Sequence, residues 1–311
     1  MNSEMAINTA QSTVRKRGPL SAFITQEAIT GYLFILPAMI GFVTFVLLPV
    51  VRGAYISLTN WNLLRDADFV GLENYQALAN DPAFWNALRT TALYVLYNIP
   101  FQTVIGLFLA VAMDRLTKSM FVRGALILPY LLSNVIAAMI WLWLLDPLLG
   151  MVNGVMGVFG IPHQAFIGSP DLALPTIAFI NIWRHMGLTA ILFYAGLQGI
   201  PKSVYEAATI DGSSEWTTFW RITLPLLRPV TVFVLVTSII GSFQIYDTVA
   251  VATNGGPMEV TRVIVFYIYD NAFKFFKMGY ATAMSMVLFA ILIVFSLVQL
   301  RLFRADQSDL A

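Results

Sequence analysis

Long apolar runs separated by short polar segments form the dominant pattern along the chain. Six of these runs reach the roughly 17 to 25 residues that a helix needs to cross the hydrocarbon of a bilayer. The runs begin near Gly31, Thr91, Ala125, Leu172, Val230 and Tyr280. Because backbone crosses lipid only as helix or as a closed barrel, the pattern predicts an all-α membrane protein with six transmembrane helices.

The predicted transmembrane domain extends over residues 29–303, between polar tails at residues 1–28 and 304–311. Cations at residues 15–17 precede the first run, as they precede the apolar region of a signal peptide. The run is long enough to span a bilayer, and no small-residue cleavage site follows it. It is therefore interpreted as a retained first helix.

Lysine and arginine are distributed unequally between the two sets of connecting segments. Six spans place both termini on one side, and cytoplasmic segments carry the excess of these cations. The segments on the side of the termini hold eleven of them: Arg15, Lys16, Arg17, Arg115, Lys118, Arg123, Lys202, Arg221, Arg228, Arg301 and Arg304. The opposite segments hold six: Arg52, Arg65, Arg89, Arg262, Lys274 and Lys277. The bias predicts cytoplasmic termini, a cytoplasmic loop over residues 200–226 and an external loop over residues 52–90, which forms either short surface helices or a solvated connector.

The composition fits a membrane protein and excludes other classes. Charged residues make up 11% of the 311 residues, against about 25% in soluble domains. The net charge of +1 and the absence of a basic stripe argue against a nucleic-acid partner. There is no cysteine, and the two histidines, His163 and His185, cannot form a metal site alone. We predict neither a disulfide, nor a metal site, nor catalytic residues.

One polar stretch, EAATIDGSSEWTTFWRITLP, interrupts the apolar pattern within the predicted cytoplasmic loop. Ser203 and Glu206 have the spacing of a capping box, which predicts a short helix that starts there. Gly212 is suited to end that helix in a left-handed conformation. A second short helix is expected from about Ser214 until Pro225 stops it. Taken alone, the stretch is either a docking element for another protein or a connector that happens to be helical.

The spacing within this stretch resembles the signature of ATP-binding-cassette importer permeases. The triplet EAA is followed by three residues and a glycine, and then by nine residues and the sequence ITLP. Further segments resemble the carbohydrate-uptake permeases of the maltose and glycerol-3-phosphate type: VGLENY, LILPY and TNGGP. The resemblance extends from about Gly31 to Phe303. It implies that the stretch couples the chain to an ATPase through Glu206, Ala207, Ala208, Asp211 and Gly212.

The same resemblance implies the architecture and the partners. The family has the type I ABC importer permease architecture and lies in the bacterial or archaeal cytoplasmic membrane as a multi-pass protein. Its members work with a second, similar permease, two ATPase subunits that bind ATP and Mg, and an extracytoplasmic solute-binding protein that would dock near TNGGP. No phosphate-binding loop of the form GxxxxGK[ST] occurs in this sequence, so the chain itself is expected to hold no cofactor and to hydrolyse no ATP.

Polar residues inside the apolar runs are the candidates for a solute pathway. Arg184 and His185 lie near the middle of the fourth run, where ionisable groups are costly and usually face a cavity. Counting from the coupling segment, the resemblance adds positions on the third and fifth runs. The complete set of substrate-binding candidates is Tyr130, Asn134, Asn181, Arg184, His185, Ser238, Ser242, Gln244 and Asp247. Alternatively, Arg184 snorkels or pairs with Asp247, and the amides and hydroxyls only hold helices together.

These residues leave the solute and two rival functions open. Amides, carboxylates and aromatic faces suit a sugar, whereas an arginine also suits a phosphorylated solute such as a glycerol phosphate derivative. An ion-coupled transporter would use Arg184, His185 and Asp247 as a charge relay, but it leaves the EAA spacing unexplained. A membrane-embedded enzyme is the other rival, but the motif HExxH does not occur, and the external carboxylates Asp66, Asp68 and Glu73 are typical of a solvated loop.

Overall fold

The computed structural model describes residues 26–116 and 119–302, and these residues form helices without any strand. An isolated bridge between Thr59 and Phe69 is the extended pairing within this part of the chain. The prediction of an all-α protein is therefore confirmed. The expected tails lie outside the described residues, except that the first helix already begins within residues 1–28.

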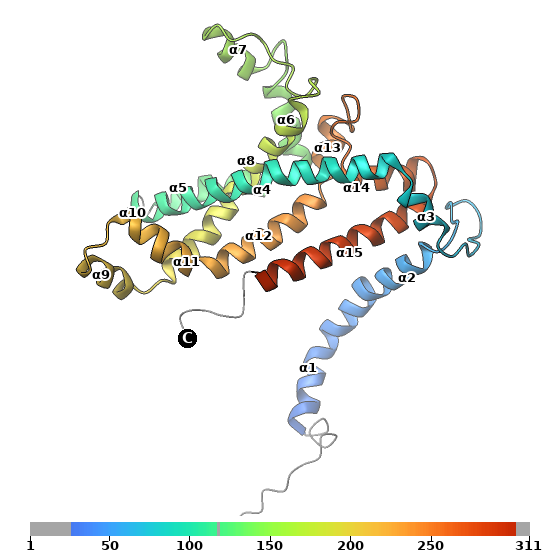
Figure 1. Cartoon of the computed structure of the whole chain (residues 1–311), viewed down its shortest axis with the longest axis horizontal. Coiled ribbons are helices and arrows are strands. Elements are labelled where there is room, and N and C mark those ends of the chain that lie inside the picture. The colour runs from blue at the N-terminus through green and yellow to red at the C-terminus, as the bar shows by residue number, and fades with distance from the viewer. Residues whose placement is uncertain (1–25, 117–118, 303–311) are drawn as a thin grey trace, which may run out of the picture. The chain divides into compact units, whose positions relative to one another are not determined.

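The chain divides between Tyr55 and Ile56 into two compact units. The first unit holds α1 (Gln26–Phe42), the π turn η2 (Val43–Leu47) and nearly all of α2 (Leu48–Ile56) (Figure 1). Together they make a continuous apolar helix whose large side chains are exposed. Such a surface is stable only in an apolar environment, as expected for the first predicted span.

The second unit contains all the other helices. Its first half consists of α3 (Glu73–Ala79), α4 (Pro82–Leu116), α5 (Met120–Leu131), α6 (Asn134–Leu144), α7 (Met151–Val158) and α8 (Ala173–Gln198). Its second half consists of α9 (Lys202–Ile210), α10 (Glu215–Thr218), η3 (Phe219–Thr223), α11 (Leu224–Leu226), α12 (Arg228–Phe243), α13 (Asp247–Ala252), α14 (Ile264–Tyr269), η4 (Asp270–Lys274) and α15 (Met278–Leu302). The helices thus run into both ends of the expected external loop 52–90, which contains α3.

Four helices are long and apolar enough to cross a membrane, and two bent pairs raise the number to as many as six. The four are Ile29–Ile56, Pro82–Leu116, Ala173–Gln198 and Met278–Arg301. The third predicted span is not one helix, because α5 and α6 meet at 96°. Leu132 and Ser133 are extended there, and the Ser133 hydroxyl accepts a hydrogen bond from the Ile136 amide at 3.2 Å. A serine N-cap inside the apolar run therefore starts a new helix.

The core of the second unit is built around the pair α4 and α8, against which α5 and α12 pack. Glycines allow close approach at two of these contacts. A Cβ atom at Gly106 of α4 would overlap the Thr189 side chain of α8, and one at Gly187 of α8 would overlap the Leu126 carbonyl of α5. Small residues at such crossings are typical of helix pairs in membranes. These contacts bring polar residues of four helices together in the interior.

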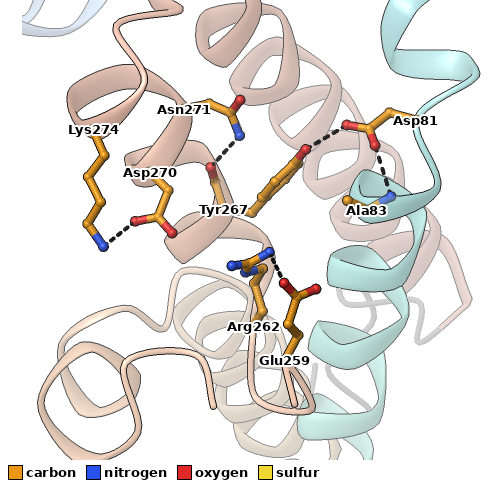
Figure 2. A network of polar contacts seen from close by, with 8 residues as sticks. All are labelled: Asp81, Ala83, Glu259, Arg262, Tyr267, Asp270, Asn271 and Lys274. Atoms are coloured by element: carbon orange, nitrogen blue, oxygen red, sulfur yellow. Dashed lines mark hydrogen bonds and ion pairs between the residues drawn. The ribbon is translucent and has the colours of Figure 1, made fainter. Parts of the chain in front are cut away.

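Asp81 ties the start of α4 to two helices that are distant in sequence, α14 through Tyr267 (Figure 2) and α15 through Tyr280. One carboxylate oxygen accepts a hydrogen bond from the Ala83 amide at 2.9 Å, the geometry of a helix N-cap. The other accepts from the hydroxyls of Tyr267 at 2.7 Å and Tyr280 at 2.6 Å. Burial acts to raise the pKa of Asp81, but the bonds from Tyr280, Tyr267 and the backbone outweigh it and hold the pKa below its ordinary value. Burial and the carboxylate raise the pKa of Tyr267 to about 12.

We expect the substitution Asp81→Ala to destabilise the protein by about 3 kcal/mol. The cap is worth about 1 kcal/mol and each of the two phenol bonds about 1 kcal/mol. Thermal unfolding of the purified protein in detergent measures the loss. Because the folded pKa is depressed, the part of this stabilisation that depends on the ionised carboxylate is fully present above the ordinary carboxyl pKa of 3.8 and is lost as the pH falls through the folded value. The control is Asp68→Ala, since that exposed carboxylate makes one side-chain contact, of 3.4 Å, with Asn60. Equal unfolding midpoints for both variants would contradict the role of Asp81.

Candidate functional site

Polar side chains from α4, α5, α6, α8, α12 and α13 line one cavity of about 430 Å³. All nine residues that were singled out in the sequence contribute to its wall: Tyr130, Asn134, Asn181, Arg184, His185, Ser238, Ser242, Gln244 and Asp247. The volume of the cavity and the convergence of these side chains on it are typical of a small-molecule site. The structure therefore brings together residues that lie up to 117 positions apart in the chain.

The break between α5 and α6 forms one wall of the cavity, and Arg184 holds it. The last carbonyl groups of a helix have no partner within that helix. Arg184 Nε donates to the Leu132 carbonyl at 2.9 Å, and Nη2 donates to the Tyr130 carbonyl at 3.2 Å. Its guanidinium also lies 5.3 Å from the centre of the Tyr130 ring. A cation at a helix C-terminus is favourable on electrostatic grounds as well.

His185 continues this arrangement along α8. Its Nδ1 lies 3.0 Å from the Asn181 carbonyl, which only accepts hydrogen bonds, so Nδ1 carries the proton. Its Nε2 lies 3.1 Å from Arg184 Nη1, which only donates, so Nε2 is the acceptor. The geometry thus assigns the neutral Nδ1–H tautomer. Three of the five guanidinium hydrogens of Arg184 have partners in this arrangement.

Asp247 and Arg184 face the same cavity without forming an ion pair. The Asp247 carboxylate instead accepts from Asn134 Nδ2 at 2.9 Å, and no salt bridge in the described part of the chain joins it to Arg184. The alternative in which Arg184 pairs with Asp247 is therefore wrong. The reason is geometric, because the α5–α6 break offers the guanidinium two carbonyl acceptors closer at hand.

A polar cluster on α4 supports the opposite wall and was not predicted. Gln102 Nε2 donates to Thr189 Oγ1 at 2.9 Å and to Ser238 Oγ at 3.2 Å. Asn98 Nδ2 donates to Ser242 Oγ at 2.9 Å. Asn98 and Gln102 lie one helical turn apart within the second apolar run, and this spacing of two amides is the sequence feature that could have predicted the cluster. The lining residues that the sequence prediction omitted are Gln102, Leu188, Thr189, Leu192, Thr237, Gly241, Ile245, Tyr246 and Thr248.

The wall of the cavity consists mainly of neutral polar groups. Its wall carries one guanidinium and one carboxylate, both with partners, and otherwise amides, hydroxyls, an imidazole and tyrosine rings. Across residues 26–116 and 119–302, no group of three or more histidine or acidic residues is placed to hold a metal ion. Amides and hydroxyls both donate and accept hydrogen bonds, so the wall matches a ligand that is rich in hydroxyl groups.

The coupling segment, residues 200–226, forms a separate surface made by α9 and α10. Helix α9 begins at Lys202, directly after Pro201, and Ser203 lies inside it, so the predicted capping box is wrong. Pro201 is extended and has no amide hydrogen, which favours the helix start one residue later. Gly212 has a φ of +72°, which confirms the predicted left-handed end. Ser214 caps α10, which confirms the predicted second helix.

Pro225 does not end the second helix of the segment. The turn η3 passes the chain from α10 into α11, and the bend of 64° comes after Leu226. In η3 the Leu224 amide bonds to the Phe219 carbonyl, five residues back. This π-type pairing replaces the α-helical ladder directly before Pro225, where a proline would otherwise clash with the preceding turn.

The exposed face of the coupling segment contains four of the five predicted coupling residues. Glu206, Ala207, Asp211 and Gly212 are exposed, whereas Ala208 is 6% exposed and points into the protein. The face also displays two large apolar residues that were not predicted to belong to it: Ile210, 86% exposed, and Trp216, 72% exposed. Exposed apolar groups of this size are typical of surfaces that contact a partner.

Two contacts join the segment and the preceding α8 to the end of α4. Arg115 Nη1 lies 2.6 Å from Glu215 Oε2, and Gln198 Nε2 donates to Asp114 Oδ1 at 2.6 Å. Both contacts are solvent-exposed, so each contributes little to stability. They nevertheless place the coupling segment at the opposite end of α4 from Asp81 (Figure 1).

Known proteins resemble the chain in both sequence and fold. A family model described as "Binding-protein-dependent transport system inner membrane component" matches residues 102–305. The arabinooligosaccharides transport system permease protein AraP of Bacillus subtilis is 32% identical over 300 residues, which cover 95% of this chain and 95% of that protein. The sn-glycerol-3-phosphate transport system permease protein UgpA of Agrobacterium fabrum is 30% identical over 287 residues, which cover 91% and 97%.

A solved structure shares the fold. It is the crystal structure of a bacterial alginate ABC transporter in complex with an alginate pentasaccharide-bound periplasmic protein. One of its chains superposes with a TM-score of 0.79 at 22% identity, and the superposition covers 92% of this chain and 97% of that one. The two chains therefore have the same helical architecture.

Proposed function

Because the chain belongs to the family of binding-protein-dependent transport system inner membrane components, we propose that it is one of two permease subunits of an ATP-driven sugar importer. The chain is accordingly a multi-pass protein of the inner membrane. The observation that carries the proposal is the polar cavity of about 430 Å³ within apolar helices that also carry a coupling segment. Membership in this family is at odds with both rivals, the ion-coupled transporter and the membrane-embedded enzyme.

In this proposal α4 transmits movement between the coupling segment and the cavity. Its 35 residues extend for about 52 Å at 1.5 Å per residue. Arg115 near one end contacts Glu215, while Gln102 in its middle holds Ser238 in the cavity wall. A displacement imposed on the segment by an ATPase would therefore reach the cavity through a rigid helix. The sequence contains no phosphate-binding loop, so ATP and Mg are assigned to the two ATPase subunits.

The wall of the cavity favours a neutral sugar. Arg184 already donates to two carbonyls, and Asp247 balances its charge within the same cavity. The remaining amides and hydroxyls match sugar hydroxyls. We assign the nine candidates named above to the binding site of this solute, in which Arg184 fixes the wall formed by the α5–α6 break. The relative UgpA and the guanidinium in the wall favour a glycerol phosphate derivative as the second candidate.

The proposal includes the remaining partners and the orientation. A second, homologous permease would complete the cavity, and an extracytoplasmic solute-binding protein would deliver the sugar near residues 253–257. The coupling segment and both termini are assigned to the cytoplasm on the distribution of lysine and arginine. The five coupling positions, including the inward-pointing Ala208, would form the docking helix and its turn.

Isolation of the complex tests the proposal. The tagged chain is extracted in mild detergent, and the co-purifying proteins are identified by mass spectrometry. We expect an ATPase and a second permease, and we expect ATP-dependent uptake of a neutral oligosaccharide in liposomes supplied with the binding protein. If the folded chain purifies alone and transports solute without ATP, the assignment to an importer subunit is wrong.

A further inference from the structure

A second cavity, of about 580 Å³, lies where two spanning-length helices of the second unit begin. Asp81 directly precedes α4, and Lys277 directly precedes α15. The complete lining is Asn60, Trp61, Asn62, Asn74, Ala77, Asp81, Tyr267, Asn271, Phe276, Lys277 and Tyr280. Because the sequence changes from polar to apolar at these helix starts, we expect the cavity to lie at the depth of the bilayer surface.

Aromatic side chains in the lining agree with this depth. Trp61 and Phe276 line the cavity, Phe276 is 44% exposed, and its neighbours in sequence, Phe273 and Phe275, are 51% and 57% exposed. Aromatic residues of membrane proteins gather at the level of the lipid headgroups. The cavity therefore faces headgroups at the end of α4 that is opposite to the coupling segment.

The cavity is lined by one carboxylate, Asp81, and one ammonium, Lys277. The Asp81 carboxylate already accepts from two phenols and an amide. The ammonium of Lys277 has no ion-pair partner among residues 26–116 and 119–302, whereas that of Lys274, three residues earlier, pairs with Asp270 at 2.7 Å. Figure 2 shows the Lys274–Asp270 pair and, at the opposite edge of the view, the contacts of Asp81 with Tyr267 and Ala83. Lys277 is thus available to an anionic group such as a phosphate.

Two side-chain amides in the same lining, those of Asn74 and Asn271, provide hydrogen-bond acceptors beside Lys277. Asn74 Nδ2 donates to the carbonyls of Ser57 and Thr59, both at 2.8 Å. Asn271 Nδ2 donates to the Tyr267 carbonyl at 3.0 Å. Within the described residues, neither side-chain oxygen receives a hydrogen bond from a protein donor. The bonds at nitrogen orient these amides, so their oxygens can accept from a ligand that carries N–H or O–H groups.

We propose that this cavity binds the headgroup of a glycerophospholipid that carries hydrogen-bond donors. The phosphate lies on Lys277, and the donors of the headgroup lie on the oxygens of Asn74 and Asn271. The ammonium of phosphatidylethanolamine and the hydroxyls of phosphatidylglycerol both supply such donors. Phosphatidylcholine does not, because its nitrogen is fully methylated. The inference is independent of the proposed solute and of the proposed ATPase partners.

Thermal unfolding of the purified complex in detergent tests this inference. The probes are the dioctanoyl forms of phosphatidylglycerol, phosphatidylethanolamine and phosphatidylcholine, inorganic phosphate, and maltotriose at equal concentration. We expect the first two lipids to raise the unfolding midpoint by at least ~3 °C, since ligands of the folded state stabilise it. Phosphatidylcholine, phosphate and maltotriose should leave the midpoint within about 1 °C.

Substitutions of lysine locate the effect. Lys277→Gln should abolish the shift, and Lys277→Arg, which keeps the charge, should retain it. Arg89→Gln, which removes an exposed cation of α4 that does not line the cavity, is the control and should show the same lipid-induced shift as the wild type. An equal shift with phosphatidylcholine would indicate unspecific lipid contact. An equal shift with phosphate would indicate a site for soluble anions, and an equal shift with maltotriose would indicate a sugar site. Each of these results, or an unchanged shift in Lys277→Gln, would overturn the proposal.

Discussion

The substitution Ala207→Arg should abolish ATP-dependent uptake while the chain remains inserted and folded. Ala207 is exposed on α9, beside the exposed Glu206 and Ile210. A methyl group lets a partner surface approach the helix backbone closely, and an arginine side chain holds that surface away. We expect uptake to fall more than tenfold, and the ATPase subunits to be lost from the purified complex. Exposed substitutions of this kind usually change stability by no more than about 0.5 kcal/mol.

The control for this experiment places the same side chain elsewhere. Ala67 is also exposed, but it lies in the connection between α2 and α3, away from the coupling segment. Ala67→Arg should transport and assemble as the wild type does. If Ala207→Arg took up solute at a normal rate, α9 would not be the docking helix, and the coupling positions assigned to it would have to be abandoned.

The coupling segment was largely predictable because its features are requirements of the local backbone. Gly212 occupies a left-handed conformation that glycine adopts without penalty, and Ser214 has the hydroxyl that an N-cap needs. The start of α9 was misjudged because Ser203 and Glu206 satisfy the capping-box pattern equally well whether or not the helix begins there. Pro201, two residues before Ser203, was the stronger signal, since its extended conformation sets the boundary.

The break in the third span could not be predicted from hydropathy averaged along the run. Hydropathy over about 20 residues reports the apolar character of a run and not its continuity. Ser133 changes that average little, yet its hydroxyl caps α6 and turns the chain by 96°. Hydropathy also misplaced the start of α4, which begins nine residues before the apolar run that predicted it. Its first turns carry fewer apolar residues, but Phe84 and Ala87 are buried in the core with residues of α14 and α15.

The cost of polar groups in an apolar setting, which one sequence reveals, pointed to Arg184 and His185, whereas the candidates on the third and fifth spans came from the resemblance to maltose-type permeases. All nine candidates line the cavity. Gln102 was overlooked because its role depends on tertiary packing. Its amide is useful only where α4 lies against Thr189 of α8 and Ser238 of α12. Helix α7 was likewise unpredictable, since Asn153 stabilises it through the Asp146 and Gln164 carbonyls across the loop.

Replacing Arg184 should reduce the maximal rate of transport more strongly than the apparent affinity for solute. In Arg184→Ala the carbonyls of Tyr130 and Leu132 lose their donor at membrane depth, which costs roughly 3 kcal/mol in total. The α5–α6 break then loses its fixed geometry. We expect the unfolding midpoint in detergent to fall and the maximal uptake rate to drop more than tenfold, while the KM for solute changes less than threefold.

The lysine variant separates this positioning role from direct contact with the solute. A lysine keeps the charge but cannot reach two carbonyls and a ring nitrogen with a planar fork, so Arg184→Lys should be nearly as impaired as Arg184→Ala. Thr237→Val is the control within the same cavity, because the Thr237 hydroxyl bonds to carbonyls of its own helix and not to the break. It should retain the maximal rate. If Arg184→Lys kept that rate and the KM rose more than tenfold in Arg184→Ala, the guanidinium would instead be a solute ligand. The charge balance that favours a neutral sugar would then no longer hold, and an anionic solute would become the better assignment.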